Sequence, residues 1–277
     1  METKLTNILK LKYKPVVLSW SDSIPEKTIQ FAKGKFGCVL NLFAAAAKGK
    51  FAACDRETFG CFGGGVGLGF GNQYNNFPGG VDCFCRFLSV GNQGYPPGET
   101  VAGYMKGKAP AHFLSDFMKG ERFIKTPELT KKFVEAMPME DMPAKYALFS
   151  PLSSVSSDSE DTTGPKIVTF IADPDQLSGL VLLATYATEN IEAVAMPFVA
   201  GCMAIGILPL RESKSENPRG IMGLIDLSAR VNVKSSLGRG FFTLSVPWKM
   251  FITMESNIPG SFFERETWKH LMDEEQK

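Results

Sequence analysis

The six cysteines are the side chains with the most chemistry in this sequence. They are Cys38, Cys54, Cys61, Cys83, Cys85 and Cys202. Thiolates are soft ligands that suit zinc, copper(I) and iron–sulfur clusters. No two of the cysteines form a C-x-x-C pair, which disfavours zinc ribbons and the bacterial ferredoxin pattern. The alternative for each cysteine is a small buried side chain in the core, the commoner fate of a free cysteine.

The segment around Cys61 is rich in glycine, with seven glycines within residues 60–71. Those that follow the cysteine most closely are Gly63, Gly64, Gly65 and Gly67. Their spacing matches neither G-x-G-x-x-G nor G-x-x-x-x-G-K-[ST], so it does not predict a nucleotide-binding loop. Two interpretations stay open. One is a closely packed backbone turn. The other is a loop that lies against a cofactor and donates backbone N–H groups to cluster sulfurs or an anion.

Cys83 and Cys85 stand two residues apart in a segment, residues 81–90, that we expect to be a strand. On a strand, both side chains would face the same side and could be a ligand pair. The sequence has only two histidines, His112 and His270, so a zinc site built from several histidines is excluded within one chain. A Ser-His-Asp or Cys-His arrangement is also disfavoured, and no catalytic residue is predicted.

Asp226 and Arg230 are four residues apart and would face each other on a helix. The simpler interpretation is a buried structural salt bridge. The alternative is that Arg230 binds an anionic substrate or cofactor, because a guanidinium presents a planar fork of donors.

The strands and helices that we expect around these residues indicate an α/β or α+β protein, with a mixed sheet and flanking helices. Strands are expected at residues 16–20, 51–54, 166–172, 191–196 and 240–246, and helices at residues 36–47 and 127–137. A helix opening at Asp173-Pro174 between two strands predicts a crossover and a parallel strand pair. A strand followed by a small-residue segment with a cysteine occurs in both parts of the chain, so two similar halves are a further expectation.

Composition favours one folded domain over all 277 residues, with a candidate subdomain boundary in the serine-rich, acidic loop at residues 153–164. The net charge of +1, without a basic run, disfavours nucleic acid as a partner. The sequence has no continuous apolar stretch of about 18 residues, which disfavours a membrane span. It also begins without a signal-like apolar run, so we expect a cytoplasmic protein with reduced cysteines.

Several segments together resemble an uncharacterised family of archaea and anaerobic bacteria, the domain of unknown function 169 family. The segments start at Pro15-Val-Val-Leu, Cys38, Phe59-Gly-Cys61, Ile167-Val-Thr-Phe, Gly201-Cys202, Asp226-Leu-Ser-Ala-Arg230 and Val246-Pro-Trp. The family has no established activity to carry over. The resemblance implies that Cys38, Cys61 and Cys202 stand at family-like positions, whereas Cys54, Cys83 and Cys85 are not placed by it.

These observations lead to a first hypothesis, an iron–sulfur or other thiolate-bound metal protein of anaerobic redox metabolism. Cys38, Cys61 and Cys202 would hold a [4Fe–4S] cluster with one iron open, or with Cys54 as the fourth ligand. The glycines after Cys61, and Arg230, would bind the cofactor. The first alternative is a metal-free protein that binds a small molecule or nucleotide and has core cysteines. The second is an enzyme with a cysteine nucleophile, in which Cys61 would act. The expected partner is a small molecule or a redox protein, or a second copy of the chain.

Overall fold

The computed structural model describes residues 3–155 and 166–273. The chain separates into two compact units, Met1–Phe70 with Glu140–Lys277 and Gly71–Met139. The subdomain boundary expected at 153–164 lies mostly on residues 156–165, outside the described residues, and stays a prediction. Within the described residues, no helix is both long enough and apolar enough to cross a membrane.

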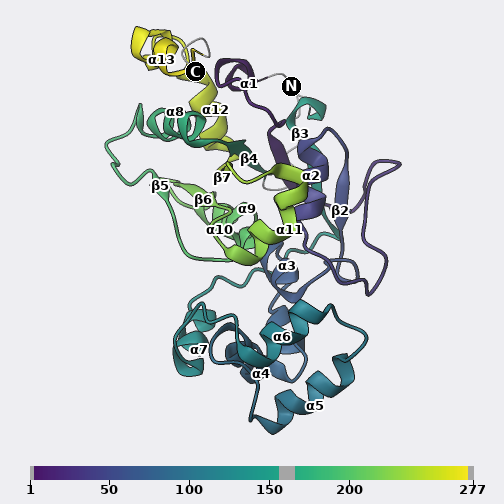
Figure 1. Cartoon of the computed structure of the whole chain (residues 1–277). Helices are drawn as coiled ribbons and strands as arrows, with labels where there is room; N and C mark the ends of the chain where they lie inside the picture. Colours follow the sequence, from purple (N-terminus) through teal and green to yellow (C-terminus); the bar gives the residue numbers. More distant parts are fainter. Residues whose placement is uncertain (1–2, 156–165, 274–277) are drawn as a thin grey trace. The chain divides into compact units, whose positions relative to one another are not determined.

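The first unit is built on a seven-stranded mixed sheet with the order β2-β3-β1-β4-β7-β6-β5 (Figure 1). The strands are β1 (Val16–Ser21), β2 (Ala52–Cys54), β3 (Tyr146–Pro151), β4 (Lys166–Ala172), β5 (Val194–Ala195), β6 (Gly220–Gly223) and β7 (Phe242–Pro247). Every neighbouring pair is antiparallel except β5 and β6, which are parallel. A mixed sheet with flanking helices confirms the predicted α/β class.

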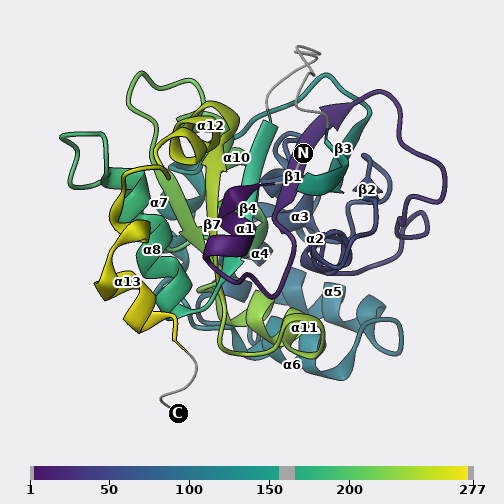
Figure 2. The ribbon, with the colours of Figure 1, turned by 90° about the horizontal axis from the view of Figure 1, so that it is seen from above.

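Both faces of the sheet are covered, which explains why its central strands are almost continuously apolar. Val168, Phe170 and Ala172 of β4 point to a core formed with α1 (Lys4–Ile8), α8 (Pro174–Thr185), α12 (Trp248–Ser256) and α13 (Glu266–Leu271). Helices α8 and α13 lie side by side, as Figure 2 shows, and a Cβ on Gly179 would come within 2.6 Å of the Trp268 ring. The turns η2 (Leu152–Ser154) and η3 (Phe262–Glu264) complete this layer.

The other face of the sheet carries the helices that contain the predicted site residues. These are α2 (Leu40–Ala47), α3 (Phe62–Gly67), α9 (Gly201–Ile205), α10 (Ile207–Glu212) and α11 (Leu227–Leu237). Helices α2, α9 and α10 contact the strands, while α3 packs on α9 and α11 packs on α2. Segments that are far apart in the sequence therefore meet in one layer.

The crossover predicted after β4 is present, but its pairing differs from the prediction. As predicted, Asp173 caps α8, and the structure adds that it forms a capping box with Gln176. The strand that follows, β5, pairs in parallel with β6, whereas β4 lies between β1 and β7 and is antiparallel to both. The predicted parallel pair of β4 and β5 is therefore wrong, because two strands later in the chain stand between them.

The second unit is helical. Its elements are η1 (Gln73–Asn76), α4 (Gly80–Leu88), α5 (Pro96–Met105), α6 (Ala111–Lys119) and α7 (Pro127–Glu135). The strand predicted at residues 81–90 is wrong, because this segment forms α4. Phe84 and Phe87 are three residues apart, and both rings pack against Phe77, with Phe87 stacked and Phe84 tilted. A separation of three residues places the two side chains on one face of the helix.

Candidate functional site

Four helices of the first unit begin close to three cysteines and one aspartate. Cys61 is the N-cap residue of α3, Asp226 is the N-cap residue of α11, and Cys202 is the second residue of α9. Cys38 lies two residues before the first residue of α2. Because α3 packs on α9 and α11 packs on α2, the starts of these helices bring the four side chains into one region.

Glycines allow α3 and α9 to approach each other very closely. A Cβ on Gly67 would lie 2.7 Å from the carbonyl carbon of Cys202, and a Cβ on Gly206 would lie 2.0 Å from the oxygen of Gly67. The thiol of Cys202 donates to the carbonyl oxygen of Gly63 over 3.0 Å. The glycine-rich segment therefore contains a short helix, α3, that packs against the backbone of α9. This is close to the predicted interpretation of a closely packed backbone turn.

The carboxylate of Asp226 joins the starts of α9 and α11. Its Oδ2 accepts a hydrogen bond from the N–H of Gly201 and its Oδ1 from the N–H of Ala229, both over 2.7 Å. A Cβ on Gly201 would lie 2.7 Å from Cδ1 of Leu40 in α2. Asp226 thus fixes the helix that carries Cys202 beside the helix that follows Cys38.

The three cysteines at these helices influence one another electrostatically. Burial raises the pKa of Cys38 to about 12, and Cys61 and Asp226 contribute to the rise. Burial also raises the pKa of Cys202 well above its usual range, with further contributions from Cys61, Cys38 and Asp226. Cys202 is 6% exposed, whereas Cys38 and Cys61 are half-buried. Burial, the neighbouring thiols and Asp226 all favour the neutral thiol form of the three cysteines.

Each of the three sulfurs also faces backbone N–H groups at the start of its own helix. Cys61 accepts from Gly64 over 3.3 Å and from Gly63, which acts to lower its pKa against the larger effect of burial. Backbone hydrogen bonds from Leu40 to Cys38 and from Met203 to Cys202 act in the same direction. These donors favour the thiolate form, whereas burial favours the neutral thiol. The two effects therefore act on each pKa in opposite directions.

A family model for an uncharacterised ArCR domain of unknown function matches residues 4–257. The chain belongs to the domain of unknown function 169 family. This confirms the resemblance found in the sequence, and the matched range contains all six cysteines as well as Asp226 and Arg230. No curated protein and no solved structure matches the chain. The family description names no activity, so the function must be argued from the site.

The other three cysteines of this family member belong to other elements. Cys54 is buried in β2, and burial raises its pKa, with Asp55 and then Cys61 contributing. Cys83 and Cys85 belong to α4 in the other unit, where both are buried. A ligand pair on one face of a strand is therefore wrong for Cys83 and Cys85. Cys54 stays a predicted fourth ligand, because it lies within electrostatic reach of Cys61.

Asp226 and Arg230 do not form the salt bridge that their spacing predicted. The guanidinium of Arg230 instead donates to the carbonyl oxygens of Leu224 and Phe241, over 2.8 and 3.1 Å, and to that of Arg239. These bonds tie α11 to the turn that leads into β7. Binding of an anion by Arg230 stays a prediction. Both terminal nitrogens of its guanidinium already donate to main-chain carbonyl oxygens.

Sequence reasoning missed Asp226 as a member of the cysteine region. The available signal was an aspartate just before Leu-Ser-Ala-Arg, which is typical of an N-cap residue. That signal predicts the start of α11 but not the second bond, to Gly201. Across the described ranges 3–155 and 166–273, no three or more His, Cys, Asp or Glu side chains are arranged as a binding group for a metal ion.

Proposed function

We propose that the protein holds an iron–sulfur cluster, or another thiolate-bound metal centre, through Cys38, Cys61 and Cys202, and that it acts in anaerobic redox metabolism. One observation carries the proposal. Three thiols from chain segments that are far apart in sequence come within electrostatic reach of one another, each beside backbone N–H donors.

The electrostatics of the region fit a cationic group. Burial raises the pKa of each thiol, and Asp226 adds to the rise. The pKa values of the three thiols are influenced by burial, the other thiols, Asp226 and backbone amides, and Arg230 in turn acts to lower the pKa of Asp226. A bound metal centre adds positive charge and deprotonates its thiol ligands. Hydrogen bonds from amides to the sulfurs are the interaction that tunes cluster potentials in iron–sulfur proteins.

Among the described residues, no three or more His, Cys, Asp or Glu side chains are arranged to hold a metal ion. The proposal therefore rests on the mutual influence of the three thiols and on their amide donors, and not on a preformed ligand group. When bound, such a cluster supplies one-electron transfer or, at an iron without a cysteine, a Lewis acid.

In this proposal the residues of the chain have separate tasks. Cys38, Cys61 and Cys202 hold the cluster, and Cys54 is the candidate for a fourth ligand. Asp226 positions the start of α9 through Gly201. The glycines of α3 allow that helix to lie against α9, which keeps Cys61 and Cys202 together.

A cysteine nucleophile fits the same residues less well. Nucleophilic cysteines have a lowered pKa, because the thiolate is the reactive form. Here burial raises the pKa of Cys61 in spite of two backbone hydrogen bonds to its sulfur. The raised pKa weighs against the enzyme alternative.

The test is the iron and acid-labile sulfide content of protein purified without oxygen, together with its absorbance spectrum near 400 nm. We expect about four irons per chain. Cys38→Ala, Cys61→Ala and Cys202→Ala should each lose the iron, while Cys83→Ala, a buried cysteine of the other unit, should keep it. Protein that contains neither iron nor another metal would overturn the proposal, as would equal iron in Cys61→Ala and Cys83→Ala.

A further inference from the structure

Residues 12–14, which precede β1, join the C-terminal ends of two helices in the first unit. These helices, α2 and α11, also pack on each other. The backbone N–H of Lys14 donates to the carbonyl oxygen of Ala47 at the end of α2, over 3.0 Å. The hydroxyl of Tyr13 donates to the carbonyl oxygen of Ser236 near the end of α11, over 3.5 Å. The ring of Tyr13 also packs edge-on against Phe241, with 5.3 Å between the ring centroids.

Six exposed cations gather around these contacts. They are Lys12, Lys14, Lys48, Lys50, Lys234 and Arg239, and together we call them the basic surface. The side chain of Lys14 lies over Gly49, which separates two of the others in the chain, and a Cβ on Gly49 would lie 3.4 Å from Nζ of Lys14. Nζ of Lys12 lies 5.7 Å from the centroid of the Phe241 ring. Cations from three separate segments of the sequence therefore share one region of the fold.

No acidic side chain balances these cations within the part of the chain that the structure describes. None of the six takes part in an ion pair. The segments that carry them, residues 10–14, 45–53 and 227–241, contain neither Asp nor Glu. Since the whole chain has a net charge of +1, the rest of it carries −5. The fold has therefore concentrated positive charge that is scattered in the sequence.

Helix dipoles explain only two of the six cations. Lys48 is the C-cap residue of α2 and Lys234 lies in the last turn of α11, where the negative end of a helix favours a cation. The other four stand outside the helices. Like charges that lie close together repel each other, so an anionic partner is favoured at this surface.

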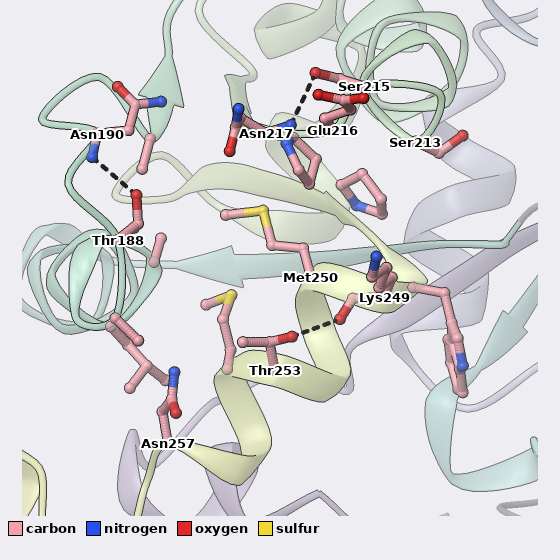
Figure 3. A pocket seen from close by; sticks show the side chains of 18 of the residues that line it. Thr188, Asn190, Ser213, Ser215, Glu216, Asn217, Lys249, Met250, Thr253 and Asn257 are labelled. Carbon is pink, nitrogen blue, oxygen red and sulfur yellow. Dashed lines mark hydrogen bonds between the residues drawn. The ribbon is translucent and has the colours of Figure 1, made fainter.

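An exposed apolar pair adjoins the basic surface on α11. Leu227 and Val231 are 64% and 73% exposed, and together with Lys234 they follow the i, i+4, i+7 spacing of one helix face. Neither this pair nor the basic surface lines the cavity between α8 and α12 that Figure 3 shows. Sites for small molecules are concave, so an exposed helix face outside that cavity fits a macromolecule better.

The apolar pair favours a protein over a nucleic acid as that macromolecule. Protein interfaces combine apolar contacts with charged groups, whereas a phosphate backbone offers charge without an apolar surface. The rings in this region are also poorly placed for bases to stack on. Tyr13 is 9% exposed, and Phe241 is half-buried between Tyr13 and Lys12.

We propose that the basic surface docks an acidic protein. Carboxylates of the partner pair with the six cations, and apolar side chains of the partner cover Leu227 and Val231. The charges accelerate association and orient the partner, while burial of the apolar pair stabilises the complex. The docking surface does not depend on the proposed metal centre, because the two share no side chain.

The test is fluorescence anisotropy of a labelled helical peptide that presents glutamates around two leucines on one face. Two matched peptides replace either the glutamates with glutamines or the leucines with serines. We expect the first peptide to bind the full chain at least about tenfold more tightly than either matched peptide, and to bind more weakly as the ionic strength rises. A short DNA duplex and vesicles of phosphatidylglycerol are the competing probes. Equal binding of the glutamine peptide, or tighter binding of either competing probe, would overturn the proposal.

Charge-reversal variants locate the binding. The triple variant Lys14→Glu, Lys50→Glu and Lys234→Glu should weaken binding of the first peptide at least about tenfold. The control makes the same change in net charge at three exposed lysines of the other unit, Lys106→Glu, Lys108→Glu and Lys125→Glu, and should bind like the unchanged chain. If both triple variants lost the same affinity, net charge alone would hold the peptide and the site would be refuted.

A double variant tests the apolar contact separately. Leu227→Ser with Val231→Ser should weaken binding of the first peptide about tenfold and leave binding of the serine peptide unchanged. Both side chains are exposed, so circular dichroism should show an intact fold. Unchanged binding of the first peptide would remove the apolar pair from the interface and contradict docking of a protein.

Discussion

Replacing Gly67 with alanine tests the contact between α3 and α9 on which the cysteine region depends. A Cβ at this position would lie 2.7 Å from the carbonyl carbon of Cys202, 2.8 Å from the nitrogen of Met203 and 2.9 Å from Cβ of Cys202. Two of these atoms belong to the backbone, so no side-chain rotation can relieve the overlap. The two helices must move apart.

Two opposing effects set the size of the change in stability. Overpacking of a close contact costs about 1–3 kcal/mol. Alanine in place of a helical glycine returns about 1 kcal/mol through its lower backbone entropy in the unfolded chain. We therefore expect Gly67→Ala to destabilise the protein by up to about 2 kcal/mol.

Gly103 in α5 is the matched control, since it is also a helical glycine. No described atom lies within 4 Å of a Cβ built on Gly103, apart from its own neighbours and helix backbone. Gly103→Ala should therefore stabilise the protein by up to about 1 kcal/mol. Denaturation in urea measures both variants. If Gly67→Ala were as stable as Gly103→Ala, the described packing of α3 on α9 would be wrong.

The same variant links packing to the proposed function. Cys61 and Cys202 stand on the two helices that must separate, so Gly67→Ala should also bind less iron than Gly103→Ala. If Gly67→Ala lost stability but kept its full iron content, the contact between α3 and α9 and the proposed metal centre would be independent of each other.

Two further predictions concern pH. Burial raises the pKa of Glu212, but its hydrogen bonds and ion pair with Arg219 outweigh this, so the pKa lies below its ordinary value. The stabilisation by this pair is therefore present above the unfolded pKa of about 4.3 and is lost as the pH falls through the folded pKa. In urea denaturation, Arg219→Gln should then cost about 1–3 kcal/mol at pH 7, and the cost should decrease as the pH falls below about 4.3 and Glu212 becomes protonated. A cost that stays constant down to the pH at which Glu212 is fully protonated would contradict the charged pair. For the metal-free protein, the raised pKa values of Cys38 and Cys61 predict slow alkylation at pH 7 that accelerates as the pH rises towards 10. Mass spectrometry after iodoacetamide treatment measures the rate of alkylation. Alkylation at pH 7 as fast as that of free cysteine would contradict the raised pKa values of Cys38 and Cys61.

Local sequence signals were reliable where a few neighbouring residues decide the structure. The side chain of Thr126 caps α7, the helix predicted at residues 127–137, by accepting a hydrogen bond from the N–H of Leu129. Asp173 caps α8, where a helix start was predicted. Capping depends on hydrogen bonds within one turn, so four residues contain the information. The apolar runs of β4 and β7 were also found, because strands covered on both faces are apolar at almost every position.

The error at residues 81–90 has a physical cause. Cys83, Phe84, Cys85 and Phe87 are all buried in α4, so the segment has apolar residues at neighbouring as well as helical positions. Short apolar runs of this kind do not distinguish a helix from a strand by periodicity alone. The aromatic core of the helical unit, with Phe77 and Phe117 against Phe87, decided the outcome.

The sequence alone determined the α/β class, most strands of the sheet, several helix starts and the set of thiols. Tertiary structure decided which of those thiols lie within electrostatic reach of one another. Cys38, Cys61 and Cys202 are brought together by the packing of α2, α3, α9 and α11, which depends on close contacts at Gly67 and Gly201 and on the two bonds of Asp226. Contacts between segments more than a hundred residues apart leave no periodic signal in a single sequence. They depend on shape and on the satisfaction of buried polar groups, which exist only in the folded chain.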